Sequence, residues 1–174
     1  MQGFLLKIWQ ALRLPAGLQL FLMRRVNDQF LIGVTGIFLD TNEKVLLVNH
    51  SYRDDNSWSL PGGYAKAGEH PKEALEREIK EETGYEVSAD ERLKIRTDRK
   101  TARLDITYMG AFIGGVFAPS KEITKAKLFK FDKLPIIPED QLMFIQKALQ
   151  IKQNEPTIGL QAKKKNLQNI SPNG

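Results

Sequence analysis

The chain of 174 residues contains no cysteine and only two histidines, His50 and His70. The lack of cysteine excludes disulfide bonds, thiolate zinc sites and a cysteine nucleophile. The two imidazoles lie twenty residues apart and form no recognisable zinc pattern. Any metal ion must therefore be bound mainly by oxygen ligands, which favours a hard cation such as Mg²⁺ or Mn²⁺.

Long hydrophobic runs are also missing. No apolar run approaches the roughly 20 residues of a membrane-spanning helix, and the N-terminal segment lacks the ordered regions of a secretory signal. We therefore expect a cytoplasmic protein. Hydrophobic residues make up 41% and charged residues 27% of the chain, as in ordinary globular proteins. The length suits one domain with short extensions.

The middle of the chain lacks an excess of charge, although the formal net charge is +5. Residues 1–27 carry +4 and residues 153–174 carry +2, which leaves −1 for residues 28–152. The basic excess therefore belongs to the termini. A nucleic-acid-binding domain is not indicated by this distribution.

The hydrophobic pattern predicts helices at both ends of a strand-rich region. Strands are expected at 31–39, 45–48, 92–96, 104–117 and 126–131, with the first two paired centrally, and helices at 4–12, 15–22, 71–83 and 138–152. Gly110, Gly114 and Gly115 predict bends in the fourth strand. The expected domains are a helical extension at 1–28, one folded domain at 29–152, and a disordered polar tail at 153–174.

The helix at 71–83 carries glutamates on an unusual face. With Glu78 at zero, Glu82 lies at roughly +40° and Glu81 at roughly −60°, on the same side as Leu75 and Ala74. An amphipathic helix normally places carboxylates on the opposite, solvated side. A divalent cation could neutralise such a cluster, although a charge-rich surface helix is the alternative interpretation.

The residues around this helix form a recognisable motif. The segment reads Gly63-x5-Glu69-x7-Arg77-Glu78-Ile79-x-Glu81-Glu82-x-Gly84-Tyr85. It resembles the Nudix box, G-x5-E-x7-R-E-U-x-E-E-x-G-U, where U is a bulky apolar residue. Every polar and glycine position matches, and Tyr85 is an aromatic residue where an aliphatic one is usual.

This resemblance implies an α/β (α+β) Nudix fold, an α/β/α sandwich with a curved mixed sheet between helices. It also implies a metal-dependent hydrolase that cleaves a pyrophosphate bond in a nucleoside diphosphate derivative through water activated by Mg²⁺ or Mn²⁺. The implied metal ligands are Glu78, Glu81 and Glu82, with Glu69 as a contributor, and Arg77 would orient a carboxylate. The general base is Glu122, Glu81 or Glu82, because Lys125 stands where the family often has an acid.

Substrate contacts are predicted from residues near the motif. Gly62 and Gly63 allow a close backbone approach, although they also suit an ordinary turn. Arg53 is a further candidate, and Arg103 ends a basic stretch, 92–103, that could meet phosphates or form a solvated hairpin. Trp58 could stack on a base or simply pack in the core.

The expected partner is a nucleotide-derived small molecule. Family markers for ADP-ribose and for dinucleoside polyphosphates are both missing after the motif, so the sequence leaves the substrate open. An RNA-end pyrophosphohydrolase and a non-catalytic nucleotide-sensing module are the alternatives. The helices of residues 1–28 are expected to pack on the domain or on a second subunit of a homodimer, with reversible membrane contact as the alternative.

Overall fold

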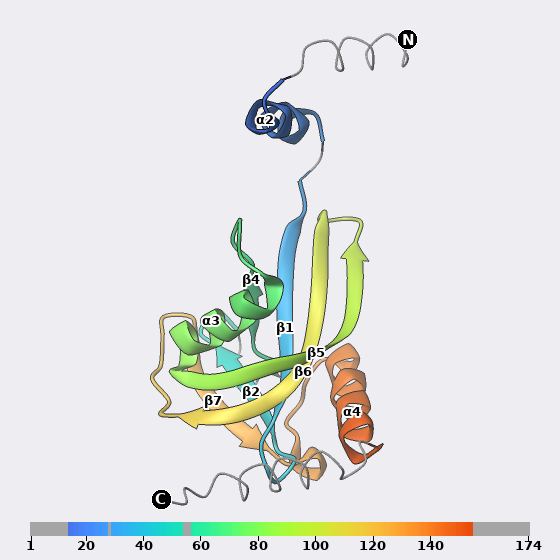
Figure 1. Ribbon diagram of the computed structural model, residues 1–174. Helices are drawn as coiled ribbons and strands as arrows, with labels where there is room; N and C mark the ends of the chain where they lie inside the picture. The colour runs from blue at the N-terminus through green and yellow to red at the C-terminus, as the bar shows by residue number, and fades with distance from the viewer. Residues whose placement is uncertain (1–13, 28, 54–56, 155–174) are drawn as a thin grey trace, which may run out of the picture.

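The computed structural model describes residues 14–27, 29–53 and 57–154. In chain order these residues form α2 (Ala16–Val26), β1 (Leu31–Leu39), β2 (Val45–His50), β3 (Trp58–Ser59), β4 (Gly62–Tyr64), α3 (Pro71–Thr83), β5 (Tyr85–Asp98), β6 (Arg103–Gly115), β7 (Ile123–Phe129), the 3₁₀ turn η1 (Phe131–Lys133) and α4 (Glu139–Asn154). Within this described part, seven strands form one mixed sheet. Figure 1 shows α3 and α4 on opposite sides of the sheet, so the predicted sandwich is confirmed.

The central strand β1 supplies side chains to two hydrophobic cores. Phe38 packs with Leu75 and Ile79 of α3, whereas its neighbour Ile37 packs with Ile145 of α4. All five side chains are at most 1% exposed. Because successive side chains of a strand point to opposite faces, a continuous apolar run such as that of β1 requires cover on both sides.

The pairing of the first two strands differs from the predicted central pair. β1 and β2 pair only at Leu39 and Val45, next to the turn that joins them. From Leu31 to Leu39, β1 instead pairs in parallel with β6, and its other edge pairs with β4. β2 pairs with β3 and β7. These long-range partners satisfy the backbone groups of two strands that diverge after their turn.

Strand β5 is longer than predicted, whereas its partner β6 nearly matches its prediction. The expected strands at 92–96 and 104–117 become 85–98 and 103–115. Register shifts interrupt the pair at Glu86/Val87, Ala89/Glu91 and Arg92/Lys94. The first shift leaves Ile113 of β6 without a register partner beside Gly114, and Gly115 has φ 104°, so the irregularity predicted at these two glycines is confirmed. The other two shifts lie on β5, and Gly110 continues β6 opposite Ala89.

Helix α3 begins and ends where the sequence predicts. Pro71 occupies its first turn, and Gly84 ends it in the left-handed region at φ 74°. His70 Nδ1 accepts a hydrogen bond from the backbone N–H of Lys72, and the backbone N–H of His70 donates one to Glu73 Oε2. This capping box fixes the N-terminal end of the helix, and so fixes the rotational position of its glutamates.

The terminal helices meet the predictions in part. α2 confirms the helix that Pro15 was expected to start, extends it to Val26 and has no buried residue, while α4 matches the helix predicted at 138–152. The helix expected at 4–12 and most of the tail expected at 153–174 lie outside the described residues. In the described part of the chain, no helix has both the length and the apolar character needed to span a membrane.

Candidate metal and substrate site

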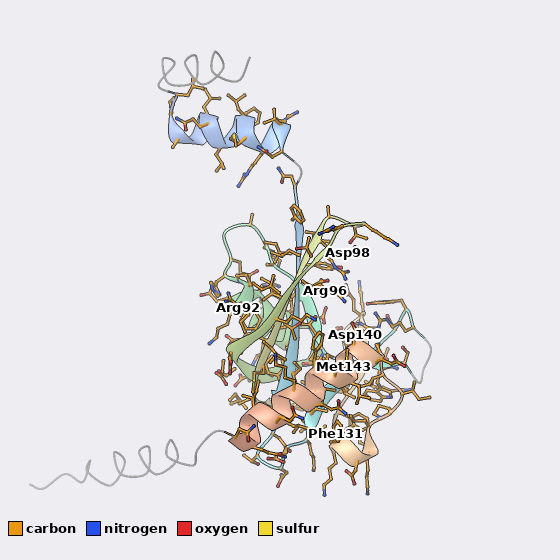
Figure 2. The ribbon with its side chains drawn as sticks, turned by 90° about the vertical axis from the view of Figure 1, so that its right-hand side faces the viewer. Arg92, Arg96, Asp98, Phe131, Asp140 and Met143 are labelled. Carbon is orange, nitrogen blue, oxygen red and sulfur yellow. The ribbon has the colours of Figure 1, made fainter. Side chains whose placement is uncertain are left out.

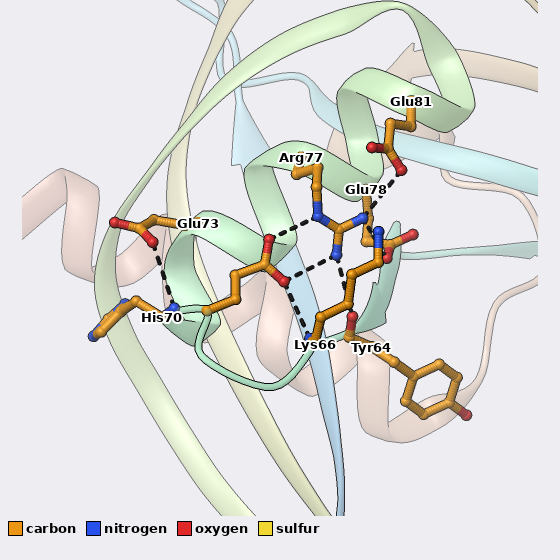
Figure 3. A network of polar contacts seen from close by, with 8 residues as sticks. Tyr64, Lys66, His70, Glu73, Arg77, Glu78 and Glu81 are labelled. Carbon is orange, nitrogen blue, oxygen red and sulfur yellow. Dashed lines mark hydrogen bonds and ion pairs between the residues drawn. The ribbon is translucent and has the colours of Figure 1, made fainter.

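Arg77 is the centre of the polar network on α3, as Figure 3 shows. Its Nε and Nη2 donate to the two carboxylate oxygens of Glu69 at 2.7 and 3.0 Å. Its Nη1 lies 2.7 Å from Glu78 Oε1 and 3.0 Å from Glu81 Oε2. One guanidinium therefore positions three of the four glutamates of the motif, through a two-bond fork to Glu69 and single contacts to the other two.

Glu69 closes the loop before α3. Besides the two bonds from Arg77, its Oε2 accepts the backbone N–H of Lys66 at 3.1 Å. These hydrogen bonds, first from Arg77 and then from Lys66, lower the pKa of Glu69 to about 2. Both carboxylate oxygens of Glu69 are thus engaged in holding Arg77 and the loop in place.

Gly63 of β4 lies directly against Glu78. A Cβ atom at residue 63 would stand 2.5 Å from Glu78 Cγ, a distance that no side chain tolerates. On its other side β4 pairs with β1, with Gly63 opposite Val34. The glycine therefore lets α3 approach the sheet closely enough for the Glu78 side chain, which is 18% exposed, to lie between them.

Glu82 is the glutamate with the least compensated charge. Burial raises its pKa to about 7, and the carboxylates of Glu78, Glu122 and Glu81 add to this shift. Arg77 contacts Glu78 and Glu81, but within the described residues no cation is paired with Glu82. The electrostatic influence of Glu122 also places this residue, which precedes β7, in the neighbourhood of the α3 glutamates.

The donor set fits a hard divalent cation. Residues 14–27, 29–53 and 57–154 contain no ready-made group of three acids or histidines closed around one point. Glu78 and Glu81 are held at Arg77, so their remaining oxygens and the carboxylate of Glu82 would complete a site by side-chain rotation. A carboxylate whose pKa is raised by burial and by neighbouring carboxylates, as that of Glu82 is, has the environment that a divalent cation stabilises.

The raised pKa of Glu82 makes the stability of the metal-free protein depend on pH. The folded pKa of about 7 exceeds the ordinary value of 4.5, so the native state binds more protons than the unfolded state between these values. The free energy of unfolding therefore falls as pH rises from about 4.5 to 7. In a chelator above pH 7, Glu82→Gln should raise stability by about 1–2 kcal/mol, after discounting for solvent screening.

Thermal unfolding of both proteins in EDTA measures this difference. A gain of roughly 3–6 °C is expected at about pH 8 and should disappear at about pH 5. Equal unfolding temperatures for the two proteins at every pH would show that Glu82 is not under this electrostatic strain.

A cavity of about 240 Å³ adjoins the glutamates beside β4. Four of the predicted substrate contacts line it, namely Gly62, Gly63, Arg53 and Arg103. Gly63 is the link between the two regions, because it both lines the cavity and contacts Glu78. Gly63 therefore places this cavity, with Arg53 and Arg103 in its lining, next to Glu78 of α3.

His50 and Tyr52 also line this cavity, although the sequence analysis did not select them for it. His50 Nδ1 is buried without a hydrogen-bond partner among the described residues, and burial followed by Arg53 lowers the pKa of His50. Ser51, which lies between His50 and Tyr52 in the sequence, donates its backbone N–H to the Glu122 carbonyl at 2.8 Å. No local motif marks these residues, since the distant segment before β7 holds them in place.

Trp58 does not line either this cavity or the one beside it. Its ring packs edge-on against Phe129 with the centroids 4.9 Å apart, as part of the core on the α4 side of the sheet. The structure therefore supports the packing interpretation of Trp58.

Comparisons with known proteins agree with this architecture. The model of the NUDIX domain matches residues 29–148. Human 8-oxo-dGDP phosphatase NUDT18 is 33% identical over 90 residues, which cover 51% of this chain and 28% of the human protein. The chain thus spans less than a third of that relative. ADP-ribose pyrophosphatase of Methanocaldococcus jannaschii is 28% identical over 119 residues, covering 66% of this chain and 70% of that protein.

A solved structure extends the likeness to the fold. UDP-X diphosphatase superposes with a TM-score of 0.63 at 23% sequence identity, covering 79% of this chain and 72% of that one. At this level of identity the comparison concerns the arrangement of helices and strands.

Proposed function

The chain belongs to the NUDIX domain family, whose model matches residues 29–148, and on that premise we propose that it is a divalent-metal-dependent hydrolase. Its substrate would be a nucleoside diphosphate linked to another moiety, cleaved at the pyrophosphate bond. The observation that carries this proposal is the crowding of Glu78, Glu81 and Glu122 around Glu82 beside a cavity that contains arginines.

We assign the cation, Mg²⁺ or Mn²⁺, to Glu78, Glu81 and Glu82. When bound there, it would neutralise charge on the pyrophosphate oxygens and lower the pKa of a water molecule. Glu69 was a further candidate ligand. Since both of its oxygens accept hydrogen bonds from Arg77 and Lys66, we assign it the task of positioning Arg77 instead.

The general base is proposed to be Glu122, with Glu81 or Glu82 as the alternative. Glu122 is exposed, and its charge contributes to the raised pKa of Glu82, which supports a position near the α3 glutamates, where a general base would act. Its backbone is tied to Ser51. Lys125, which stands where the family often has an acid, lies within β7 opposite Asn49 of β2.

Arg53 and Arg103 are proposed to hold the substrate phosphates in the cavity. Guanidinium groups form directed hydrogen bonds with phosphate oxygens, and the two residues reach the cavity from different segments of the chain, after β2 and in β6. Gly62 and Gly63 would let the pyrophosphate approach the backbone of β4. We further propose residues 29–152 as the catalytic unit and residues 1–28 as an extension of it.

A panel of nucleotides tests this function. Purified protein is incubated with nucleoside triphosphates, nucleotide sugars, ADP-ribose, dinucleotides and capped RNA, with Mg²⁺, Mn²⁺ or EDTA, and the products are identified. We expect a nucleoside monophosphate from at least one nucleoside diphosphate derivative, only when metal is present. Metal-dependent activity that survives both Glu81→Gln and Glu82→Gln would contradict the proposed site, and a panel without any turnover would contradict the function.

A further inference from the structure

A second cavity, of about 290 Å³, opens beside the first one. The two share Thr35, Arg53, Arg103, Asp105 and Gln141 as lining residues. A molecule whose pyrophosphate lies beside Gly63 could therefore extend into the second cavity without crossing a wall of protein. The first turn of α4 and the strands β5 and β6 form its remaining sides.

The second cavity carries more positive than negative side chains. Its lining contains the cations Arg53, Lys94, Arg96 and Arg103 and the carboxylates Asp105 and Asp140. Figure 2 shows Arg96 on β5 facing the first turn of α4, where Asp140 lies. Four cations and two acids leave an excess of positive charge along the lining of the cavity, which attracts anions.

The two carboxylates are already occupied by the arginines. Asp105 lies 2.7 Å from Arg103 Nε and 3.5 Å from Arg96, and Asp140 lies 3.7 Å from Arg96. Arg103 Nε is nevertheless buried without a well-directed hydrogen bond in the described structure. A donor in that state gains when an anionic acceptor reaches it.

Besides Arg53, which is already proposed to hold the substrate phosphates, Lys94 is the cation of this cavity that the two acids leave uncompensated. Its ammonium group lies 5.2 Å from the ring centroid of Phe144 on α4, and no ion pair joins it to a carboxylate within the described residues. The aromatic ring holds the ammonium at the cavity wall but does not neutralise it. Lys94 thus has the position and the free charge to bind an anion.

The geometry of β5 separates two kinds of basic residue in the stretch 92–103. Lys94 and Arg96 are two residues apart on one strand, so they face the same side, opposite Thr107 and Asp105 of β6. Arg99 and Lys100 lie at the exposed turn after β5 and line neither cavity. The hairpin is therefore solvated at its tip and faces a cavity along its strands.

We propose that the second cavity binds a negatively charged group, a carboxylate or a phosphate, on the moiety beyond the pyrophosphate. The protein would then prefer nucleoside diphosphate derivatives whose second moiety is anionic. This inference rests on the proposed function, because it places the pyrophosphate beside Gly63. Its new content is the chemical class of the group that the enzyme selects and the assignment of Lys94 to that selection.

Matched substrate pairs test the inference. UDP-glucuronate and UDP-glucose differ by one carboxylate, and NADPH and NADH differ by one phosphate, so the two pairs distinguish the sources of negative charge. We expect kcat/KM to be about tenfold or more higher for the anionic member of at least one pair. Lys94→Gln should reduce that ratio to about twofold, mainly through KM, whereas Lys100→Gln at the hairpin tip should leave it unchanged.

Equilibrium binding separates this inference from the proposed function. Calorimetry in EDTA compares the affinities of UDP-glucuronate and UDP-glucose, and of NADPH and NADH, for wild type, Lys94→Gln and Lys100→Gln. Tighter binding of an anionic member that is lost only in Lys94→Gln supports the second cavity even if no nucleotide is hydrolysed. Equal affinities and equal kcat/KM within both pairs, or a preference that survives Lys94→Gln, would overturn the inference while leaving metal-dependent hydrolysis intact.

Discussion

Replacement of Glu82 by glutamine is expected to lower kcat about 10²- to 10⁴-fold while the protein stays folded. The carboxylate of Glu82 has no partner cation within the described residues and is surrounded by Glu78, Glu81 and Glu122. Glutamine keeps the size and one acceptor oxygen but removes the charge that a divalent cation would bind. The loss should therefore arise in the chemical step, measured as kcat at saturating substrate and metal.

Glu76→Gln is the matched control for this substitution. Glu76 lies on the same helix, but its Oε1 accepts the backbone N–H of Ala89 at 2.8 Å, a bond that the glutamine carbonyl can also accept. Its activity should stay within about twofold of wild type. Glu82→Gln is also expected to stabilise the metal-free protein. A loss of activity caused by unfolding would instead be accompanied by a lower unfolding temperature, so the two causes can be distinguished. A Glu82→Gln enzyme with the kcat of wild type would remove Glu82 from the metal site.

Replacement of Arg77 by methionine should damage both stability and activity. Methionine retains much of the aliphatic length, but Glu69 and Glu78, whose side chains are 17% and 18% exposed, would lose their cation. Leaving partly buried carboxylates unpaired should cost about 2 kcal/mol, somewhat less than breaking a fully buried pair. Loss of the orienting contacts to Glu78 and Glu81 should lower kcat/KM a further 10- to 100-fold or so in the molecules that remain folded.

Urea unfolding and steady-state kinetics measure the two effects of Arg77→Met. Lys80→Met provides the comparison, since Lys80 is on the same helix and pairs with Glu86, but both side chains are more than half exposed. A surface pair of this kind should contribute less than about 1 kcal/mol. If Arg77→Met is no less stable and no less active than Lys80→Met, the polar network around Arg77 does not organise the site.

The local features of the site could be predicted from the sequence because their causes are local. Pro71 and Gly84 mark the ends of α3, and the helical repeat of 3.6 residues then fixes the directions of its glutamates. The degree of burial was less predictable. Glu81 is 57% exposed, while Glu78 is 18% exposed, because Gly63 of β4 approaches only the middle of the helix.

The pairing of strands could not be predicted in the same way. The short turn between β1 and β2 favours a hairpin, yet β1 pairs in parallel with β6, which begins more than sixty residues later in the chain. No local pattern encodes such a partner. The same limit applies to the second cavity, whose lining residues Thr35, Lys94, Asp105 and Phe144 meet only through that long-range pairing and the packing of α4.

The most direct test of the account is Mn²⁺ binding, measured by electron paramagnetic resonance on the full chain. Wild type, Glu76→Gln and Glu82→Gln are titrated at a pH above 7, where the Glu82 carboxyl, with its pKa of about 7, is ionised. The account predicts that wild type and Glu76→Gln bind Mn²⁺ equally, and that Glu82→Gln binds it at least about tenfold more weakly. Equal binding by all three proteins, or no binding by wild type, would contradict a divalent-cation site at the glutamates of α3.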